Sequence, residues 1–301
     1  MIRKYRWSPE AYVFVLAFAC AVAQILHPSG FGFGPGWESM AIARSLVNTG
    51  AYANPFQPGP SGATAVIPPI FPGALALLLK LLGDTPLFAA VATLAAVLAQ
   101  ALHAALLPRV SLVFFGTPTP GVIAGILAAF AFRLMPQWDA VFTATALMLF
   151  FLKASTASWR ASALSGAASG LLLLTNPTSV LITAPWVIFL RARENVPLRR
   201  LAAFVIAGCL VPLPWMIRNH RQLGTFSIKD NLGMTVYASN NDCADSGIVA
   251  SMASGCYDAR HPNGSDTELR ALIKLGEARY DSQRTIDTVQ WVAPIRGHLQ
   301  V

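Results

Sequence analysis

The residues up to Trp215 form a series of long apolar blocks separated by short polar stretches, and this series stops after Arg218. Of the 301 residues, 54% are hydrophobic and only 12% are charged, whereas an ordinary soluble domain has roughly 25% charged residues. Apolar blocks of this kind are typical of helices that cross a bilayer. We therefore expect an all-α polytopic membrane protein with a polar C-terminal segment outside the membrane.

The apolar blocks predict seven transmembrane helices. They cover residues 11–26, 87–107, 120–135, 140–152, 161–174, 179–190 and 201–215. Several blocks are shorter than the roughly 20 residues that a transmembrane helix needs, so these helices would extend into flanking residues or tilt. A further apolar block at residues 70–82 is shorter still for a span, and its role depends on the charges around it.

Positive charge decides whether residues 70–82 cross the membrane. Residues 1–216 carry 13 Lys and Arg against five Asp and Glu, whereas the rest of the chain carries nine of each. If residues 70–82 lie in the interface and the N-terminus is cytoplasmic, most of these basic residues fall on the cytoplasmic side, as membrane topology favours. We therefore expect seven spans and one interfacial helix, and the basic excess reflects topology rather than a nucleic-acid partner.

This topology gathers the polar segments on the extracytoplasmic face. We expect a transmembrane module over residues 1–216, with an outer loop at 27–69 that contains one helical piece at Trp37–Val47, and an extracytoplasmic helical and irregular segment over 217–301. A disulfide between Cys243 and Cys256 is possible if this segment faces an oxidising compartment, and the sequence leaves open whether it forms. The stretch Asp266–Arg284 predicts one charged surface helix.

The membrane part has two carboxylates that are candidates for chemistry. Glu38 opens the helical piece of the outer loop and shares a face with Ile42 and Leu46, where a carboxylate is costly unless it has a partner or a function. The alternative is that Glu38 is an acid favoured by the dipole at a helix N-terminus. Asp139 lies at the outer end of the span 140–152, with the same two interpretations open.

Polar residues at the ends of the outer turns are further candidates. Asn176 precedes Pro177 in a turn between two spans and is either a substrate contact or an ordinary turn residue. Arg218, Asn219, His220 and Arg221 follow the last span. The two arginines and the histidine either anchor the helix at the interface or bind the phosphate of a lipid head group.

Several chemistries lack the residues they need. The sequence has no glycine-rich phosphate loop before a Lys-Ser or Lys-Thr pair, so it gives no support for ATP use. It has no spaced His and Cys pattern for zinc, and no Gly-x-Ser-x-Gly nucleophile elbow. Carboxylates are missing from the middle of the spans, which disfavours a proton-coupled transporter.

The outer loop carries an ordered set of motifs. They are Glu38, then Ile42-Ala43-Arg44-Ser45-Leu46, Gly50-Ala51-Tyr52, Asn54-Pro55-Phe56, Gly62-Ala63-Thr64-Ala65 and Pro68-Pro69-Ile70-Phe71-Pro72. A second motif, Pro214-Trp215-Met216-Ile217-Arg218-Asn219, is followed by Gly224 and later by Asn240-Asn241. Together these motifs resemble GT-C glycosyltransferases, in particular bacterial protein-mannosyltransferase-like and aminoarabinose-transferase-like proteins, over residues 10–241.

The resemblance implies a bacterial inner-membrane enzyme that moves a sugar from a polyprenyl-phosphate donor to a protein, lipid or glycan acceptor on the extracytoplasmic face. Many members have Asp where this chain has Glu38, which we take as its equivalent and as the general base, with Asp139 as a second acidic residue. The donor phosphate would contact Arg218, His220 and Arg221. The substrates would contact Arg44, Asn176 and Asn219.

Some alternatives stay open in the sequence. The chain could instead be a transporter or flippase of a lipid-linked saccharide. Members of the family usually continue with more spans, so this chain is either a minimal member or a truncated, inactive module. The donor sugar and any requirement for a divalent metal are also open, and we expect no metal ligand among the candidate residues.

Overall fold

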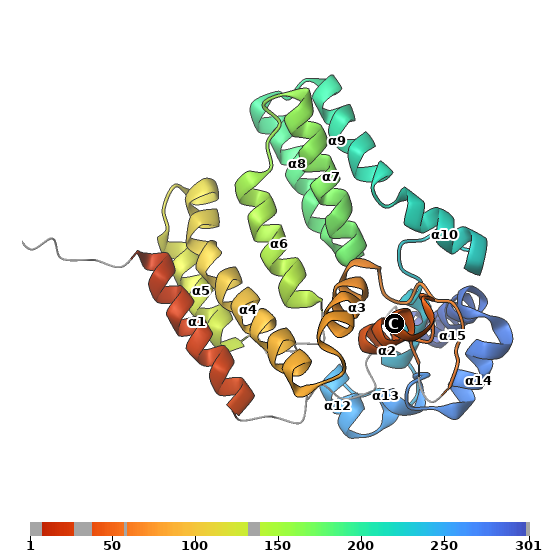
Figure 1. Ribbon diagram of the computed structural model, residues 1–301. Coiled ribbons are helices and arrows are strands. Elements are labelled where there is room, and N and C mark those ends of the chain that lie inside the picture. Colours follow the sequence, from red (N-terminus) through yellow and green to blue (C-terminus); the bar gives the residue numbers. More distant parts are fainter. Residues whose placement is uncertain (1–7, 27–37, 57–58, 132–138, 299–301) are drawn as a thin grey trace, which may run out of the picture. The chain divides into compact units, whose positions relative to one another are not determined.

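The computed structural model describes residues 8–26, 38–56, 59–131 and 139–298, and their regular structure is α-helical without strands (Figure 1). The chain divides into two compact units. The first consists of residues 1–34 and 81–213, and the second of residues 35–80 and 214–301. The described part of the outer loop, which its sequence position assigns to the membrane module, thus belongs to the same compact unit as the polar C-terminal segment.

The first unit is a set of apolar helices. They are α1 (Pro9–Leu26), α4 (Pro86–Phe115), α5 (Thr119–Ala131), α6 (Ala140–Lys153), α7 (Trp159–Thr175), α8 (Val180–Glu194) and α9 (Leu198–Leu210), with a short 3₁₀ turn at Pro177–Ser179. In the part of the chain that the structure describes, three helical stretches are long and apolar enough to cross a membrane, namely Pro9–Leu26, Pro86–Phe115 and Leu198–Leu223. Thr119–Ala131, Ala140–Lys153 and Pro177–Phe189 are shorter apolar helices.

Small residues allow these helices to pack closely. Gly166 of α7 lies against the backbone of α9, where an added Cβ would collide with the carbonyl oxygen of Phe204. Ser162 and Gly170, four residues to either side of Gly166, are also buried. Close packing through small residues at a four-residue spacing is typical of helices in a membrane, where apolar side chains gain little from being removed from lipid.

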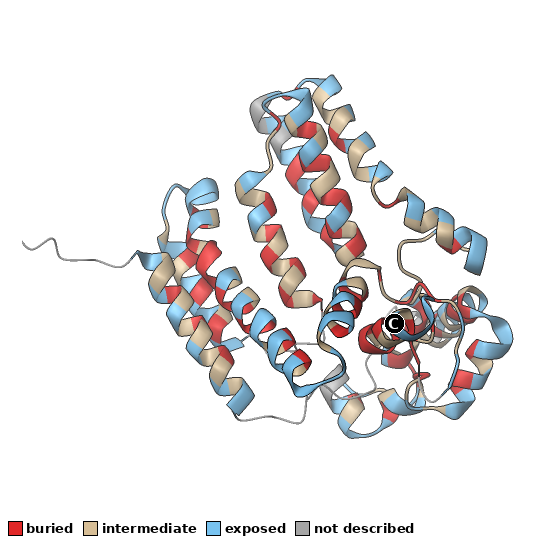
Figure 2. Cartoon of the chain, in the orientation of Figure 1, coloured by how far each residue is buried: buried red, intermediate tan, exposed pale blue. Residues whose placement is uncertain are grey.

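Many residues along the same helices are exposed (Figure 2), and a number of them have large apolar side chains. Examples are Leu94 and Leu98 on α4, Leu127 and Phe130 on α5, and Leu181 on α8. Soluble monomers rarely expose continuous apolar surface of this extent. The outer surface of the first unit is therefore suited to contact with lipid.

The second unit is built from shorter helices around its own core. Its helices are α2 (Glu38–Thr49), α3 (Ile70–Leu82), α10 (Leu213–Leu223), α11 (Leu232–Ser239), α12 (Ile248–Ala253), α13 (Cys256–Ala259), α14 (Asp266–Leu275) and α15 (Glu277–His298). Phe56 and Val66 of the outer loop pack with Met234, Leu272 and Tyr280 of the C-terminal segment. This shared core explains why two segments far apart in sequence form one unit.

The structure answers two questions about the C-terminal segment. Cys243 and Cys256, whose pairing the sequence left open, form a disulfide with their Cα atoms 5.7 Å apart. The prediction of one charged surface helix over Asp266–Arg284 is wrong. The chain turns at Gly276, which has a φ of +78°, and the two resulting helices bury acidic side chains, including Glu268 and Glu277.

Candidate functional site

Glu38 lies at the first residue of α2, and its carboxyl group is held by the C-terminal segment. The side chain of Asn263 donates a hydrogen bond from Nδ2 to Glu38 Oε1 over 2.9 Å. The Nε2 atom of His261 lies 3.6 Å from the same oxygen. Ile42, one turn along α2, is completely buried, so Glu38 borders the apolar side of this helix as the sequence predicts.

His261 is a neutral neighbour of Glu38 rather than an ion-pair partner, and its Nε2 atom lies beyond hydrogen-bond distance from the carboxylate. Its Nδ1 atom accepts the backbone N–H of Asn263 over 3.2 Å, which assigns the ring proton to Nε2, the atom that faces Glu38. Burial lowers the pKa of His261 to about 4, because a charged ring would lose its hydration. Tyr257 stacks on the imidazole with ring centres 5.1 Å apart, and Phe56 contacts it edge-on.

The surroundings of Glu38 act on its ionisation in opposite directions. Burial raises the pKa of the carboxyl group, whereas its own backbone N–H, the charge of Lys229 and the Asn263 side chain lower it. Burial outweighs the other effects, so the pKa is raised. A carboxyl group with a raised pKa in a partly apolar site is a suitable proton acceptor near neutral pH.

The partners of Glu38 were not identified from the sequence. Asn263 is 225 residues away along the chain, and no spacing rule connects two such positions. The sequence signal is the step His261-Pro262-Asn263, which is typical of a turn and does not indicate a partner. Lys229, whose charge acts on Glu38, also lay outside the predicted set.

Arg218 lies on α10 and donates to the outer loop. Its Nη1 atom donates to the carbonyl oxygen of Thr64 over 2.6 Å, and its Nη2 atom donates to the carbonyl oxygen of Tyr52 over 2.8 Å. The guanidinium group also lies over the rings of Trp215 and Tyr52, 4.8 and 5.4 Å from their centres. Arg218 therefore fixes the loop to α10, and much of its donor capacity is already used.

The structure does not gather the four polar residues after the last predicted span at one point. Asn219 is completely buried, accepts a hydrogen bond from Arg218 and donates to the carbonyl oxygen of Ser227 over 2.8 Å. His220 and Arg221 are exposed. Residues two apart on a helix point in nearly opposite directions, so His220 lies away from Arg218.

Asp139 and Asn176 meet in the first unit. Asn176 Nδ2 donates to Asp139 Oδ2 over 2.8 Å, and its Oδ1 atom accepts the backbone N–H and the hydroxyl group of Thr178. Asn176 therefore closes the turn after α7 and joins it to the start of α6. The sequence selected both residues as candidates, and the structure brings these two together.

Arg44 is the remaining residue that the sequence predicts as a substrate contact. Arg44 is half-buried on α2, in the same unit as Glu38. Among the residues that the structure describes, no group of three His, Cys, Asp or Glu side chains could hold a metal ion. No protein-family model, no curated protein and no solved structure matches this chain. Glu38 with Asn263 and His261 is therefore the best-defined candidate site on the basis of its geometry, and Lys229 acts on it electrostatically.

Proposed function

We propose that this chain is a membrane glycosyltransferase that moves a sugar from a polyprenyl-phosphate donor to an acceptor, with Glu38 as the general base. The observation that carries the proposal is the partly buried Glu38 carboxyl group, which accepts a hydrogen bond from Asn263 and faces the neutral ring of His261. The ordered loop motifs that resemble GT-C glycosyltransferases supply the substrate class.

In the proposed reaction, Glu38 accepts the proton of an acceptor hydroxyl or amine as that group attacks the anomeric carbon of the sugar. The bond between the anomeric carbon and the phosphate oxygen breaks, and polyprenyl phosphate leaves with the electron pair. Phosphate is a stable leaving group, so the reaction needs no strong acid. A single displacement of this kind inverts the configuration of the anomeric carbon.

We assign the donor phosphate to Lys229 in place of Arg218. The charge of Lys229 lowers the pKa of the Glu38 carboxyl group, and this electrostatic coupling to the site supports the assignment. The Arg218 guanidinium group already donates to two loop carbonyl oxygens and to the side chain of Asn219. A cation close to the leaving oxygen stabilises the charge that develops there.

The proposal places the second unit on the extracytoplasmic face of a bacterial inner membrane. The disulfide between Cys243 and Cys256 supports this placement, because disulfides persist in oxidising compartments. The proposal also retains seven spans, with the shorter helices of the first unit crossing the membrane by tilting, and α3 as an interfacial helix.

The test uses the full chain reconstituted in liposomes with a radiolabelled polyprenyl-phosphate sugar and membrane extract as the acceptor source. Glu38→Gln removes the base, and we expect transfer to fall by at least about 100-fold, in the range of general-base catalysis. Glu10→Gln, which changes a carboxylate of the first unit near Arg109, is the control and keeps its activity. Label that crosses between leaflets without covalent transfer, or full transfer by Glu38→Gln, would contradict the proposal.

A further inference from the structure

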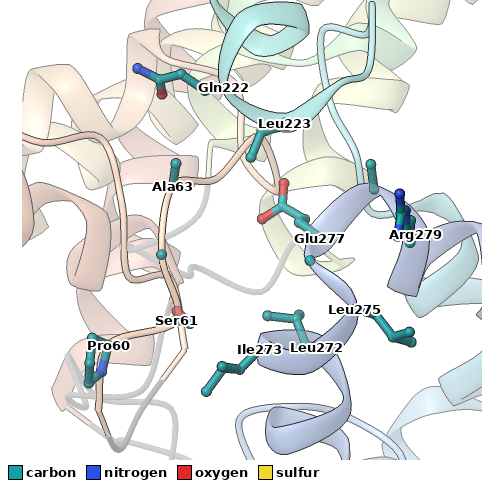
Figure 3. A pocket seen from close by; sticks show the side chains of 13 residues that line it. Pro60, Ser61, Ala63, Gln222, Leu223, Leu272, Ile273, Leu275, Glu277 and Arg279 are labelled. Atoms are coloured by element: carbon teal, nitrogen blue, oxygen red, sulfur yellow. The ribbon is translucent and has the colours of Figure 1, made fainter.

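The second unit contains a pocket with a volume of about 480 Å³ (Figure 3). Its walls come from the loop at residues 60–63, the end of α10 at Gln222 and Leu223, and the junction of α14 and α15 at residues 272–279. The volume is within the range of roughly 300–1,000 Å³ that is typical of small-molecule sites. Glu38, Asn263 and His261 do not line it, so this pocket is separate from the site described above.

Glu277 supplies a buried carboxyl group to the pocket wall. Its Oε1 atom accepts the backbone N–H of Ala65 over 2.6 Å, and its Oε2 atom bonds to the hydroxyl group of Thr64 over 2.5 Å. Thr64 and Ala65 are completely buried, so they hold the carboxyl group in one orientation. A carboxylate has about four lone-pair positions, so each oxygen can accept a further hydrogen bond from a ligand.

The charge of Glu277 is poorly compensated by the protein. Burial, with the neighbouring charge of Asp230, raises the pKa of the Glu277 carboxyl group to about 8, against the opposing effects of its two hydrogen bonds and of Arg218. Burial, together with the charge of Asp281, in turn raises the pKa of the Asp230 carboxyl group to about 6. No residue that the structure describes forms an ion pair with Glu277. A buried carboxyl group of this kind in a pocket is typical of a binding or catalytic position.

The rest of the lining combines apolar surface with neutral and cationic hydrogen-bonding groups. Leu223, Leu272 and Ile273 are apolar, whereas Gln222 supplies an amide and Arg279 an exposed guanidinium group. A free cation would meet the guanidinium group of Arg279, and a phosphate would oppose the ionisation of Glu277, whose pKa is about 8. A ring with an apolar face and hydroxyl groups at its edge matches both the apolar part of the lining and its hydrogen-bonding groups.

We propose that this pocket binds a saccharide unit whose hydroxyl groups donate to the Glu277 carboxyl group and bond to Gln222, while its apolar ring face lies against Leu272 and Ile273. Binding here does not require sugar transfer at Glu38. The pocket would therefore retain its ligand in a protein whose Glu38 has been replaced.

The first test is saturation-transfer-difference NMR on the full chain in lipid nanodiscs, with methyl α-D-glucopyranoside and methyl α-D-mannopyranoside as probes. We expect saturation transfer to the ring protons of at least one probe. Ile273→Trp fills the pocket from an exposed position and should weaken binding at least tenfold. Arg270→Ala, an exposed change on the same helix outside the lining, is the matched control and should leave binding unchanged.

Two outcomes of this test would overturn the proposal. One is the absence of saturation transfer from either glycoside to the parent protein, and the other is unchanged binding in Ile273→Trp. Competition by inorganic phosphate at millimolar concentration is the third measurement. Displacement of the glycoside by phosphate would assign the pocket to an anion instead.

The second test examines the carboxyl group itself. When the pH rises from 7 to 9, Glu277 loses its proton, and a hydroxyl group donates more strongly to a carboxylate than to a neutral carboxyl group. The parent protein should therefore bind the glycoside several-fold more tightly at pH 9, whereas Glu277→Gln, which keeps an acceptor for Ala65 and a donor for Thr64, should bind equally at both values. Equal pH dependence in both proteins would exclude contact with Glu277.

Glu38→Gln should bind the glycoside as the parent protein does. This result separates the saccharide pocket from the proposed transferase activity.

Discussion

The carboxyl group of Glu38 depends on side chains that lie more than 200 positions later in the sequence. The sequence identified Glu38 because an acid on the apolar side of a helix requires an explanation. It did not identify Asn263 and His261, because their approach to Glu38 results from the packing of Phe56 and Val66 with the C-terminal helices. Local patterns contain no information on such a contact.

Replacing Asn263 should change the pH dependence of the proposed sugar transfer. The hydrogen bond from its side chain favours the ionised form of Glu38 and so lowers the pKa of the carboxyl group. Asn263→Ala removes this donor, so the pKa should rise and the carboxylate should form only at higher pH. We expect the acid limb of the pH–rate profile for transfer to shift upward, with a larger loss of activity at pH 6 than at pH 8.

The control for this prediction is Asn240→Ala, because the Asn240 side chain donates to the carbonyl oxygen of Val236 and has no bond to Glu38. Its pH–rate profile should keep the parent shape. A uniform loss of activity across the pH range in Asn263→Ala would show that Asn263 acts on folding alone and has no specific effect on the ionisation of Glu38.

Helices form where the sequence predicts them when one apolar block lies between clear breaks. The block at residues 70–82 is such a case, and α3 has the same bounds. The prediction of one surface helix over Asp266–Arg284 is wrong, because it rested on charged residues that suggested a solvated surface. There the helices α14 and α15 meet at Gly276, and Glu268 is buried because it accepts hydrogen bonds from Tyr280 and Arg284. Partners of this kind permit the burial of an acid that composition alone would place in water.

Alanine substitutions at two helical glycines should change the stability of the protein in opposite directions. Gly166 of α7 has no room for a Cβ beside the Phe204 carbonyl oxygen, whereas a Cβ on Gly73 of α3 would meet no atom within 4 Å. Gly166→Ala must separate α7 from α9 and should destabilise the protein by about 1–3 kcal/mol. Gly73→Ala should stabilise it by roughly 0.5–1 kcal/mol, since alanine restricts the unfolded chain and favours a helix. Thermal unfolding of both variants in detergent measures the difference, and a loss of stability in Gly73→Ala would show that α3 packs more tightly than its structure indicates.

At the scale of the whole molecule, the chain combines a unit suited to lipid with a unit that contains the polar C-terminal segment and its disulfide. The sequence predicted this combination from the distribution of apolar blocks and charge. It did not predict that the outer loop would join the C-terminal segment, because that grouping depends on hydrogen bonds such as those of Glu277 and Arg218 to Thr64. The division into units therefore follows tertiary contacts and not the order of apolar and polar segments along the chain.

The proposed topology predicts which positions can be reached from outside the cell. In a background with Cys20 and Cys209 replaced by alanine, single cysteines are introduced at Ala157, Thr178 and Asp266, all of which are exposed. A membrane-impermeant maleimide should label Thr178→Cys and Asp266→Cys in intact cells, and Ala157→Cys only after the membrane is permeabilised, because seven spans with a cytoplasmic N-terminus put residues 153–160 inside. Labelling of Ala157→Cys in intact cells, with Thr178→Cys protected, would reverse the orientation of the helices. That result would also put Asp139 and Asn176 on the cytoplasmic face, apart from an extracytoplasmic sugar donor.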